Sequence, residues 1–221
     1  MRTCTLLALS IGLAACGGPD APDDSGPTAD GADATDGTTG DGDGSDGADG
    51  SDGADGGAGA LSLGLPDMVS SAGHPLESSC DVQMPVEFEC FQPNPTVTWA
   101  GAPDGTVAYV LVFDDPDAGD YPHWAIVNIP AAEGGLDAGI SGEAITNTPP
   151  DGAYELDNGF GWSGYLGSCP PAPHTYRWRL WAVSEALPEG LGSFAEVAAA
   201  ADAVALAQAS ACHVYGPRAS R

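Results

Sequence analysis

One long segment near the N-terminus limits what this chain can fold into. Residues 17–60 consist only of Gly, Asp, Ala, Thr, Ser and Pro, with no aromatic residue and no large aliphatic one. Ordering a backbone costs roughly 1–2 kcal/mol per residue, and this segment cannot bury enough apolar area to offset that cost. We therefore expect residues 16–60 to form a disordered tether and residues 61–221 to form one folded domain.

The residues before this segment have the pattern of a secretory leader. The basic start at Met1-Arg2 is followed by an apolar run over 6–13, which is too short to span a bilayer as a mature helix. The run ends in Leu13-Ala14-Ala15-Cys16, which resembles the lipobox of bacterial lipoproteins. That resemblance implies that residues 1–15 are a signal peptide and that Cys16 is lipidated. The alternative is an ordinary secretory leader with an accidental cysteine.

The residues after Cys16 bear on location and on the role of the tether. Gly17, rather than Asp, follows the cysteine, which favours an exported protein anchored by lipid to the outer membrane, on its periplasmic or cell-surface face. In the tether, Asp recurs about every three residues and Gly follows it, a spacing that would suit calcium. The segment lacks the closing Glu of an EF-hand loop, so a flexible spacer is the favoured interpretation.

The charge of the domain excludes some partners. Residues 61–221 contain four arginines and 20 acidic residues, a net charge of −16, and the whole chain contains no lysine. Binding to nucleic acid or to an anionic lipid surface requires basic patches, so we expect neither partner. Uniform acidity of this kind more often indicates solubility and weak self-association.

The domain is predicted to be mainly β. Four runs rich in β-branched and aromatic residues predict strands, at 95–99, 107–113, 124–129 and 176–183. Gly, Pro, Asn and Asp clusters between them are typical of turns. One C-terminal helix is predicted from Ser193, an N-cap with Glu196 three residues later, through the Ala-rich stretch to about Ser210.

Four cysteines remain in the domain once Cys4 and Cys16 of the N-terminal segment are set aside: Cys80, Cys90, Cys169 and Cys212. An even number of cysteines in an exported domain predicts two disulfides. Three pairings are possible and all stay open. No two of these cysteines have the spacing of a CxxC zinc site.

Two polar clusters follow or precede predicted strands. The first is 114–118, after which His123-Trp124 opens the next strand; the second is 164–171, followed by His174-Thr175-Tyr176. Strand-end loops with His and Asp beside Pro turns suit a small pocket for a phosphate or carboxylate group. Taken singly, each cluster is equally typical of an ordinary turn with a structural histidine.

Taken in order, these segments resemble the phosphatidylethanolamine-binding protein family, in particular its bacterial Raf-kinase-inhibitor-like (YbhB/YbcL) branch. Members of the family show D-P-D-A-P at the end of a strand, then H-W, then G-x-C-P-P or G-P-x-P-P leading into H-R-Y. The chain supplies Asp115-Pro116-Asp117-Ala118, His123-Trp124, Gly167-Ser168-Cys169-Pro170-Pro171 and His174-Thr175-Tyr176. The segments 94–99 and 158–161 also resemble family motifs, so the resemblance covers about 84–217.

This resemblance implies a fold and a site. The implied fold is a β-sandwich with a large central sheet packed on a smaller one. The implied ligand pocket lies between the loop with the D-P-D-A-P motif and the loop with the G-x-x-P-P motif. The implied pocket residues are Asp115, Asp117, His123, Gly167, Pro170 and His174, with Tyr165 and Trp124 as apolar walls. We expect the two histidines to donate to an anionic oxygen. The chain departs from the family pattern at Gly119, Ser168 and Thr175.

No evident nucleophile accompanies these residues. We therefore expect non-enzymatic binding of a small anionic or phospholipid-head-group-like ligand, with no cofactor and no metal, in a domain tethered to the membrane through lipidated Cys16. Two alternatives remain: an interaction or structural module with a vestigial pocket, and a metal-dependent hydrolase that uses His123, His174 and Asp115. A serine hydrolase fits poorly, because the segment 161–165 fails G-x-S-x-G at its last position.

Overall fold

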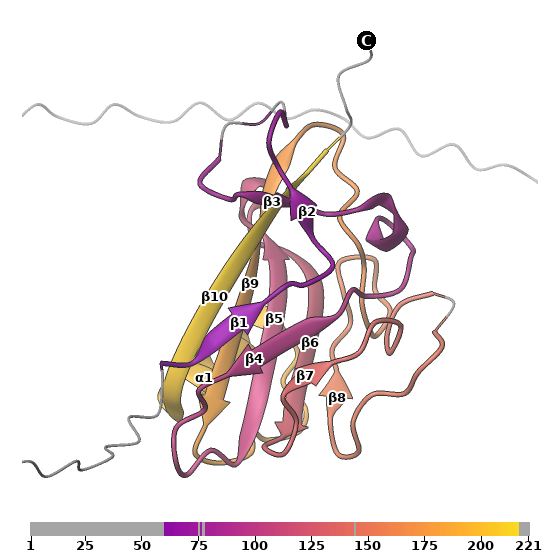
Figure 1. The fold of residues 1–221 in the computed structure, drawn as a ribbon. Helices are drawn as coiled ribbons and strands as arrows, with labels where there is room; N and C mark the ends of the chain where they lie inside the picture. Colours follow the sequence, from indigo (N-terminus) through magenta and orange to yellow (C-terminus); the bar gives the residue numbers. More distant parts are fainter. Residues whose placement is uncertain (1–59, 75, 77, 144, 217–221) are drawn as a thin grey trace, which may run out of the picture. The chain divides into compact units, whose positions relative to one another are not determined.

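Two β-sheets make up most of the structure, a computed structural model that describes residues 60–74, 76, 78–143 and 145–216 (Figure 1). The expected leader, the lipidation site Cys16 and the tether up to residue 59 lie outside the described residues. The large sheet has the order β2 (Val69–Ser70), β3 (Val82–Gln83), β10 (Ala205–Tyr215), β9 (His174–Val183), β5 (Ala108–Asp115), β6 (Tyr121–Pro130), β8 (Tyr154–Glu155). The small sheet has the order β1 (Ser62–Gly64), β4 (Val97–Ala100), β7 (Gly135–Leu136). The strand pairs are antiparallel except for β10 with β3.

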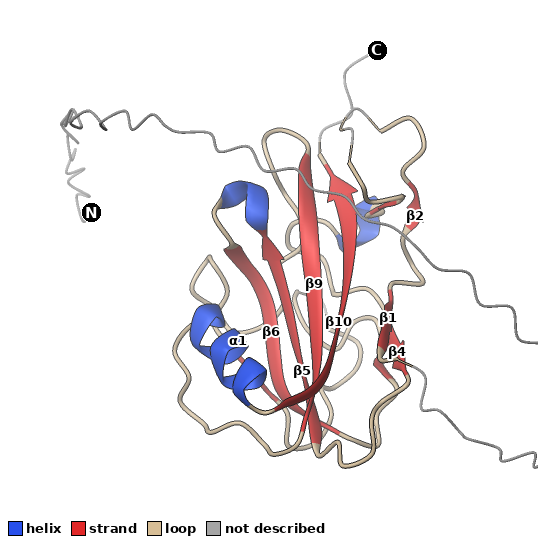
Figure 2. Ribbon diagram, turned by 90° about the vertical axis from the view of Figure 1, so that its left-hand side faces the viewer, coloured by secondary structure: helices blue, strands red, loops and turns tan. Residues whose placement is uncertain are grey.

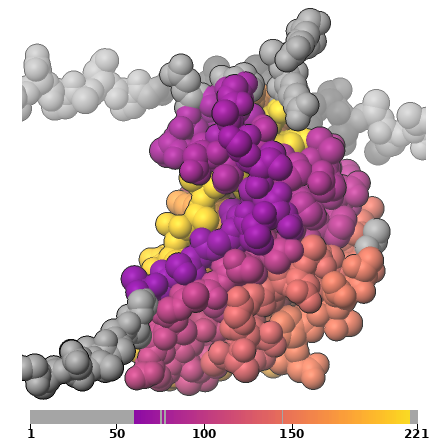
Figure 3. Space-filling model, in the orientation of Figure 1, coloured from indigo at the N-terminus to yellow at the C-terminus, as the bar shows by residue number. Residues whose placement is uncertain are grey.

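The central strand β5 is buried along its whole length, as its run of apolar residues predicts. Its alternate side chains Tyr109, Leu111 and Phe113 belong to a core that includes Val97 and Trp99 of the small sheet. On the opposite face, Val110 and Val112 pack in a second core with Phe194 and Val197 of helix α1 (Phe194–Ala203). The large sheet therefore separates the small sheet from the helix, as Figure 2 shows. On the face seen in Figure 3, the N-terminal part of the described chain covers the central strands, with β10 visible beside it.

The expected β-sandwich with a C-terminal helix is confirmed, and the four predicted strands correspond to β4, β5, β6 and β9. The predicted extent of the helix was wrong. The helix begins after the N-cap Ser193, whose Oγ accepts the N–H of Glu196, but it ends at Ala203 instead of about Ser210. Residues 205–215 form β10, which pairs with β9 from Ala205 to Tyr215. Of the described residues, none form a helix with the length and apolarity that a bilayer span requires.

The Ala-rich sequence of β10 is helix-favouring, but the sheet decides its conformation. A preference of at most about 0.7 kcal/mol per residue for helix is smaller than the cost of leaving the backbone groups of β9 unpaired in the protein interior. Ala207, Ala209 and Ala211 lie on alternate positions and pack against the core beneath the small sheet. Their small side chains let a second layer lie close to the strand.

The structure resolves the pairing that the sequence left open. Cys80 is bonded to Cys212, with their Cα atoms 5.7 Å apart, and Cys90 to Cys169, with their Cα atoms 4.8 Å apart. The first bond connects the segment before β3 to β10. The second connects the loop after the 3-10 helix η1 (Val86–Phe88) to the Gly167–Pro171 loop. Both disulfides therefore link the N-terminal half of the domain to its C-terminal half, one at the loop before β9 and the other at β10.

Candidate functional site

Two adjacent aspartates at the end of β5 point to opposite faces of the large sheet. Asp114 is buried on one face, where its carboxylate accepts hydrogen bonds from Arg177 Nε at 2.9 Å, Arg177 Nη2 at 2.8 Å and Arg179 Nη2 at 2.5 Å. These hydrogen bonds with Asp114 are the main cause that raises the pKa of Arg177. Arg177 and Arg179 are the two arginines in the described part of the chain, and both are held by Asp114. Neither is therefore free to serve a ligand on the other face.

Asp115 lies on the face that carries the pocket. Its Oδ1 accepts the backbone N–H of Ala118 at 3.2 Å, which caps the 3-10 helix η2 (Pro116–Ala118). Its Oδ2 lies 2.7 Å from His174 Nδ1, the first residue of β9. Gly119 ends η2 with φ of 72°, in the left-handed region where the family-type Pro could not be placed. The departure at this position therefore suits the turn that the chain makes.

A β-bulge sets the direction of His123. Phe113 of β5 pairs with Trp124 of β6, but the next residue Asp114 pairs with Pro122, so His123 is an extra residue in the strand. Its ring lies 4.9 Å from the Phe113 ring, on the pocket face. His123 Nδ1 lies 2.8 Å from the carbonyl oxygen of Leu166, which can only accept, so Nδ1 carries the proton.

Burial lowers the pKa of His123. The hydrogen bond to Leu166 and the negative charges of Asp115 and Asp114 oppose this shift without cancelling it. The imidazole is therefore neutral at neutral pH, with Nε2 as an acceptor. The expectation that His123 donates to an anion then requires a second proton on the ring.

The Gly167–Pro171 loop closes the pocket on the third side. Gly167 donates its N–H to the carbonyl of Cys90 at 2.7 Å, and Cys90 donates to the carbonyl of Ser168 at 3.2 Å. A Cβ on Gly167 would lie 2.2 Å from the carbonyl oxygen of Phe88, so only glycine permits this approach. The Cys90–Cys169 disulfide fixes the same contact covalently.

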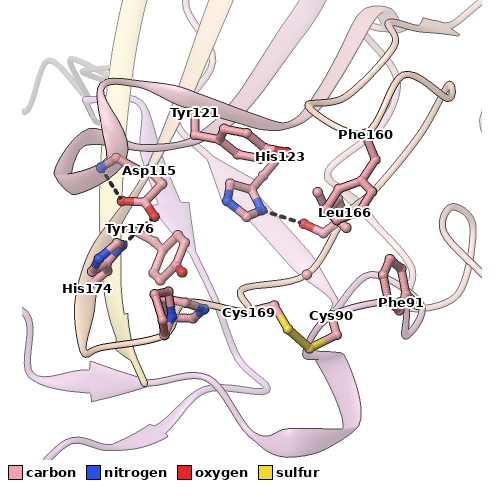
Figure 4. Close-up of a pocket in the computed structure, with 14 residues that line it drawn as sticks. Cys90, Phe91, Asp115, Tyr121, His123, Phe160, Leu166, Cys169, His174 and Tyr176 are labelled. Atoms are coloured by element: carbon pink, nitrogen blue, oxygen red, sulfur yellow. Dashed lines mark hydrogen bonds and ion pairs between the residues drawn. A yellow bond between two sulfur atoms is a disulfide. The ribbon is translucent and has the colours of Figure 1, made fainter. Parts of the chain in front are cut away.

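These elements enclose a pocket of about 280 Å³. It is lined by Cys90, Phe91, Asp115, Ala118, Tyr121, His123, Phe160, Leu166, Gly167, Cys169, Pro170, Pro171, His174 and Tyr176. In the close-up of Figure 4, Asp115 and His174 lie on one side, His123 near the centre, and Phe91 and Phe160 on the other side. Burial, followed by the negative charge of Asp115, raises the pKa of Tyr176, so its phenol keeps its proton and can donate.

The structure brings five of the eight predicted ligand-binding residues together: Asp115, His123, Gly167, Pro170 and His174 line the pocket. Three others do not line it. Asp117 is exposed, and its Oδ2 accepts the N–H of Thr175 at 2.7 Å, which connects η2 to the start of β9.

The two residues expected as apolar walls lie in the core instead. Trp124 is fully buried and donates its Nε1–H to Glu155 at 2.5 Å. Tyr165 is also buried, and its hydroxyl donates to the carbonyl of Phe88 at 2.8 Å. Both large side chains reach the core shared with the small sheet, Trp124 because the bulge at His123 pairs it with Phe113, and Tyr165 from the loop before β9.

Sequence reasoning missed several lining residues. Tyr176 lies two positions after His174 on β9 and Tyr121 two before His123 on β6, so period-two alternation could have identified both. Cys90, Phe91 and Phe160 come from loops far away in the chain. The disulfide pairing that brings Cys90 to the pocket is not readable from the sequence.

Ser168 and His213 form a buried pair that superficially resembles a catalytic dyad, with Ser168 Oγ 2.9 Å from His213 Nε2. However, Trp178 Nε1, which can only donate, lies 2.9 Å from His213 Nδ1. The neutral ring therefore carries its proton on Nε2 and donates to Ser168. A general base would need the opposite tautomer. The family departure Ser168 is thus part of one buried hydrogen-bonded unit with His213.

His213 should make the domain sensitive to acid. Burial, with a smaller contribution from the charge of His123, lowers the pKa of His213 to about 3, whereas in the unfolded chain a histidine titrates near about 6.5. Between these values only the unfolded chain takes up the proton, so stability is full above pH of about 6.5 and falls by roughly 1.4 kcal/mol per pH unit below it.

Urea unfolding at several pH values tests this expectation, and the His213→Gln variant should show a shallower fall because glutamine can keep both hydrogen bonds without titrating. His123 retains part of the slope. Equal slopes for the variant and the unmodified protein would contradict the assignment.

The site has no geometry for a metal among the residues that the structure describes. No group of three or more His, Cys, Asp and Glu side chains lies close enough to share an ion. His174 and Asp115 instead bind one another. The hydrolase alternative therefore has neither an evident nucleophile nor a ligand set within the described chain.

Comparisons with known proteins agree with the motifs. The sequence model of the phosphatidylethanolamine-binding protein family matches residues 73–216. YbcL of Escherichia coli is 37% identical over 102 residues, which are 43% of this chain and 55% of that protein. LppC of Mycobacterium tuberculosis, named as a candidate lipoprotein, is 38% identical over 111 residues, 47% of this chain and 51% of that protein. The chain thus spans about half the length of these curated relatives.

A solved structure supports the same grouping. The crystal structure of E. coli YbcL, described as a member of the mammalian PEBP family, superposes with a TM-score of 0.60 at 26% identity. The match covers 72% of this chain and 99% of that one.

Proposed function

The chain belongs to the phosphatidylethanolamine-binding protein family, and on that premise we propose that its domain binds a small anionic ligand, without catalysis, in the pocket between β5, β6 and β9. Membership of this family makes the chain a protein of a ligand-binding or regulatory type. The identity of the ligand as an anion, such as a phosphate ester or a phospholipid head group, is our proposal.

One observation carries the proposal. His123 and His174 line the same pocket, and the protein occupies Nδ1 of each ring, through the Leu166 carbonyl and the Asp115 carboxylate. In the described part of the chain, no side chain hydrogen-bonds to either Nε2, while the backbone of Gly167 also lies near the His123 ring. When both rings are protonated, two Nε2–H groups are available to a ligand oxygen.

The charges around the pocket set the conditions for binding. The described arginines are bound to Asp114, so the two imidazoles are the groups of the pocket that can become positive. His123 is neutral at neutral pH because burial lowers its pKa. An anion in the pocket stabilises the imidazolium, so binding takes up a proton and should strengthen as the pH falls.

We therefore expect sulfate to bind more tightly at pH 5.5 than at pH 8, by up to about tenfold per pH unit where one proton is taken up. Sulfate is the suitable probe because its charge does not change between pH 5.5 and pH 8. A phosphate group would itself titrate in this range, since its second pKa is about 6. Calorimetry, together with NMR of the histidine ring signals, measures both the affinity and the ring that responds.

The His123→Asn variant, whose amide can still donate to the Leu166 carbonyl, should bind more weakly at every pH and lose the part of the pH dependence that comes from His123. His174→Ala should weaken binding without removing the effect of His123. If sulfate, phosphate, acetate and phosphorylethanolamine all leave both ring signals unchanged, the pocket is vestigial and the interaction-module alternative holds.

We further propose that the domain is exported and tethered to a membrane through residues 16–60 and a lipid on Cys16. Two disulfides support export, since such bonds persist in oxidising compartments, and the name of the LppC relative supports a lipoprotein. Outer-membrane placement is part of the same proposal. Mass spectrometry of the N-terminal peptide tests the lipidation, and a Cys16→Ser variant should be released from membranes.

A further inference from the structure

Two exposed aromatic rings stand at the mouth of the pocket. Seven large apolar side chains are exposed in the described part of the chain, and the only aromatic ones are Phe91, 43% exposed, and Phe160, 59% exposed. Both line the pocket. Exposed phenylalanines at a pocket mouth call for an explanation, because contiguous exposed apolar surface commonly marks a binding site.

The two rings belong to a packed cluster with Trp162, which we call the aromatic rim. The ring centroids of Phe91 and Phe160 are 5.5 Å apart and edge-to-face, and those of Phe160 and Trp162 are 5.2 Å apart. Phe91 and Trp162 are 5.8 Å apart. All three distances lie in the range where aromatic pairs attract one another.

The turn that carries Phe160 is fixed by hydrogen bonds of Asn158 and by the packing of Gly159. The buried Asn158 accepts the N–H of Phe160 at 3.0 Å through its Oδ1 and donates to the carbonyl of Gly164 at 2.9 Å. Gly159 lies against the ring of Tyr121, where a Cβ would come within 2.1 Å of Cζ. The turn that presents Phe160 is therefore built into the fold, and the ring's exposure is not the result of a loose loop.

Polar and apolar groups are separated within the pocket. His123, His174 and Asp115 provide its hydrogen-bonding groups, whereas Phe91 and Phe160 lie together on the side away from His174, near the Cys90–Cys169 disulfide (Figure 4). The volume of about 280 Å³ approaches the lower limit, about 300 Å³, of pockets that hold drug-sized ligands. An inorganic tetrahedral anion at the histidines would leave the aromatic end unfilled.

We propose that the ligand is an organic ester of a tetrahedral anion, whose apolar group packs against the aromatic rim while its anionic group reaches the histidines. This inference rests on the proposed anion binding. It adds that selectivity among anions comes from Phe91 and Phe160, which Trp162 supports by packing against both rings, and that inorganic anions bind more weakly than such esters.

Two ligands that share one anionic group can distinguish the role of the aromatic rim from anion binding by the histidines. Methyl sulfate and phenyl sulfate carry the same single negative charge and differ only in the apolar group. We expect phenyl sulfate to bind the domain about tenfold more tightly than methyl sulfate at pH 5.5, since aromatic contacts contribute about 0.5–1.5 kcal/mol beyond area burial and 1.4 kcal/mol is tenfold. Phe160→Ala should reduce the affinity for phenyl sulfate about tenfold and leave that for methyl sulfate within about twofold.

Ile145→Ala is the matched control, because Ile145 is 57% exposed, against 59% for Phe160, and does not line the pocket. It should change neither affinity. Equal binding of the two esters by the unmodified protein would overturn this inference while leaving the proposed anion binding intact. An equal loss for both esters in Phe160→Ala would also overturn it, and failure of both esters to bind would remove the inference together with the proposed function.

Discussion

Replacing Asp114 with Asn should lower the free energy of unfolding by about 3 kcal/mol, the lower end of the range for breaking a buried ion pair, because the side chains of Arg177 and Arg179 are 37% and 21% exposed. Asp114 is 1% exposed and accepts hydrogen bonds from both Arg177 and Arg179. The amide has the size of the carboxylate, so the variant removes charge without opening a cavity. Arg179 would then lose its counter-charge at the end of β5, and Arg177 would keep only the exposed Asp120.

Urea unfolding measures this loss, and Asp120→Asn is the control. Asp120 also binds Arg177, at 2.8 Å, but its side chain is 68% exposed. We expect it to cost less than about 1 kcal/mol, as surface ion pairs do. If the two variants lose the same stability, the buried Asp114 contributes no more to the free energy of unfolding than the exposed Asp120.

Removing the Cys90–Cys169 bond by a double Cys→Ser substitution should have two effects. The bond joins residues 79 positions apart, and loss of a native disulfide from a small domain costs about 2–5 kcal/mol. Both cysteines also line the pocket, and the bond holds the Gly167–Pro171 loop against the Cys90 segment. We therefore expect weaker binding of phenyl sulfate as well as lower stability.

The Cys80–Cys212 bond is the matched comparison, since it joins residues 132 positions apart and lines no part of this pocket. Its removal should lower stability by a similar amount and leave the ligand affinity of the folded domain unchanged. Affinity must be measured without urea, at a temperature where circular dichroism shows that both variants are folded. A loss of affinity with Cys80 and Cys212 replaced, but not with Cys90 and Cys169 replaced, would contradict the role of the pocket disulfide.

The elements that the sequence predicted well are those in which local pattern and tertiary packing agree. The strand β5 has a continuous apolar run and is buried on both faces, and Ser193 and Glu196 mark the start of α1. The C-terminal end of the helix was wrong because residues 205–210 favour helix locally while pairing with β9 requires a strand. That competition is decided by a neighbour far away in the sequence, which composition does not reveal.

The site also has a part that local motifs predicted and a part that depends on contacts between distant segments. Motif order brought Asp115, His123 and His174 to one pocket, although it did not foresee the tautomer of His123, which depends on a carbonyl 43 residues further along the chain. Trp124 follows His123 directly, yet the bulge sends one ring to the pocket and the other to the core. The aromatic rim was missed because Phe91 comes from a different loop than Phe160 and Trp162, and exposed phenylalanines carry no motif.

The disulfide connectivity has a consequence for how the protein matures. Cys80 and Cys90 leave the ribosome or a translocation pore well before their partners, and Cys90 precedes Cys169 by 79 residues. An oxidant that acts in order of emergence would join Cys80 to Cys90, which is the wrong bond. Correct assembly therefore requires oxidation to wait for β9 and β10, or an isomerase to reshuffle the early bond. Biogenesis of this domain is in this sense a post-translational event, completed only when its final strand has arrived.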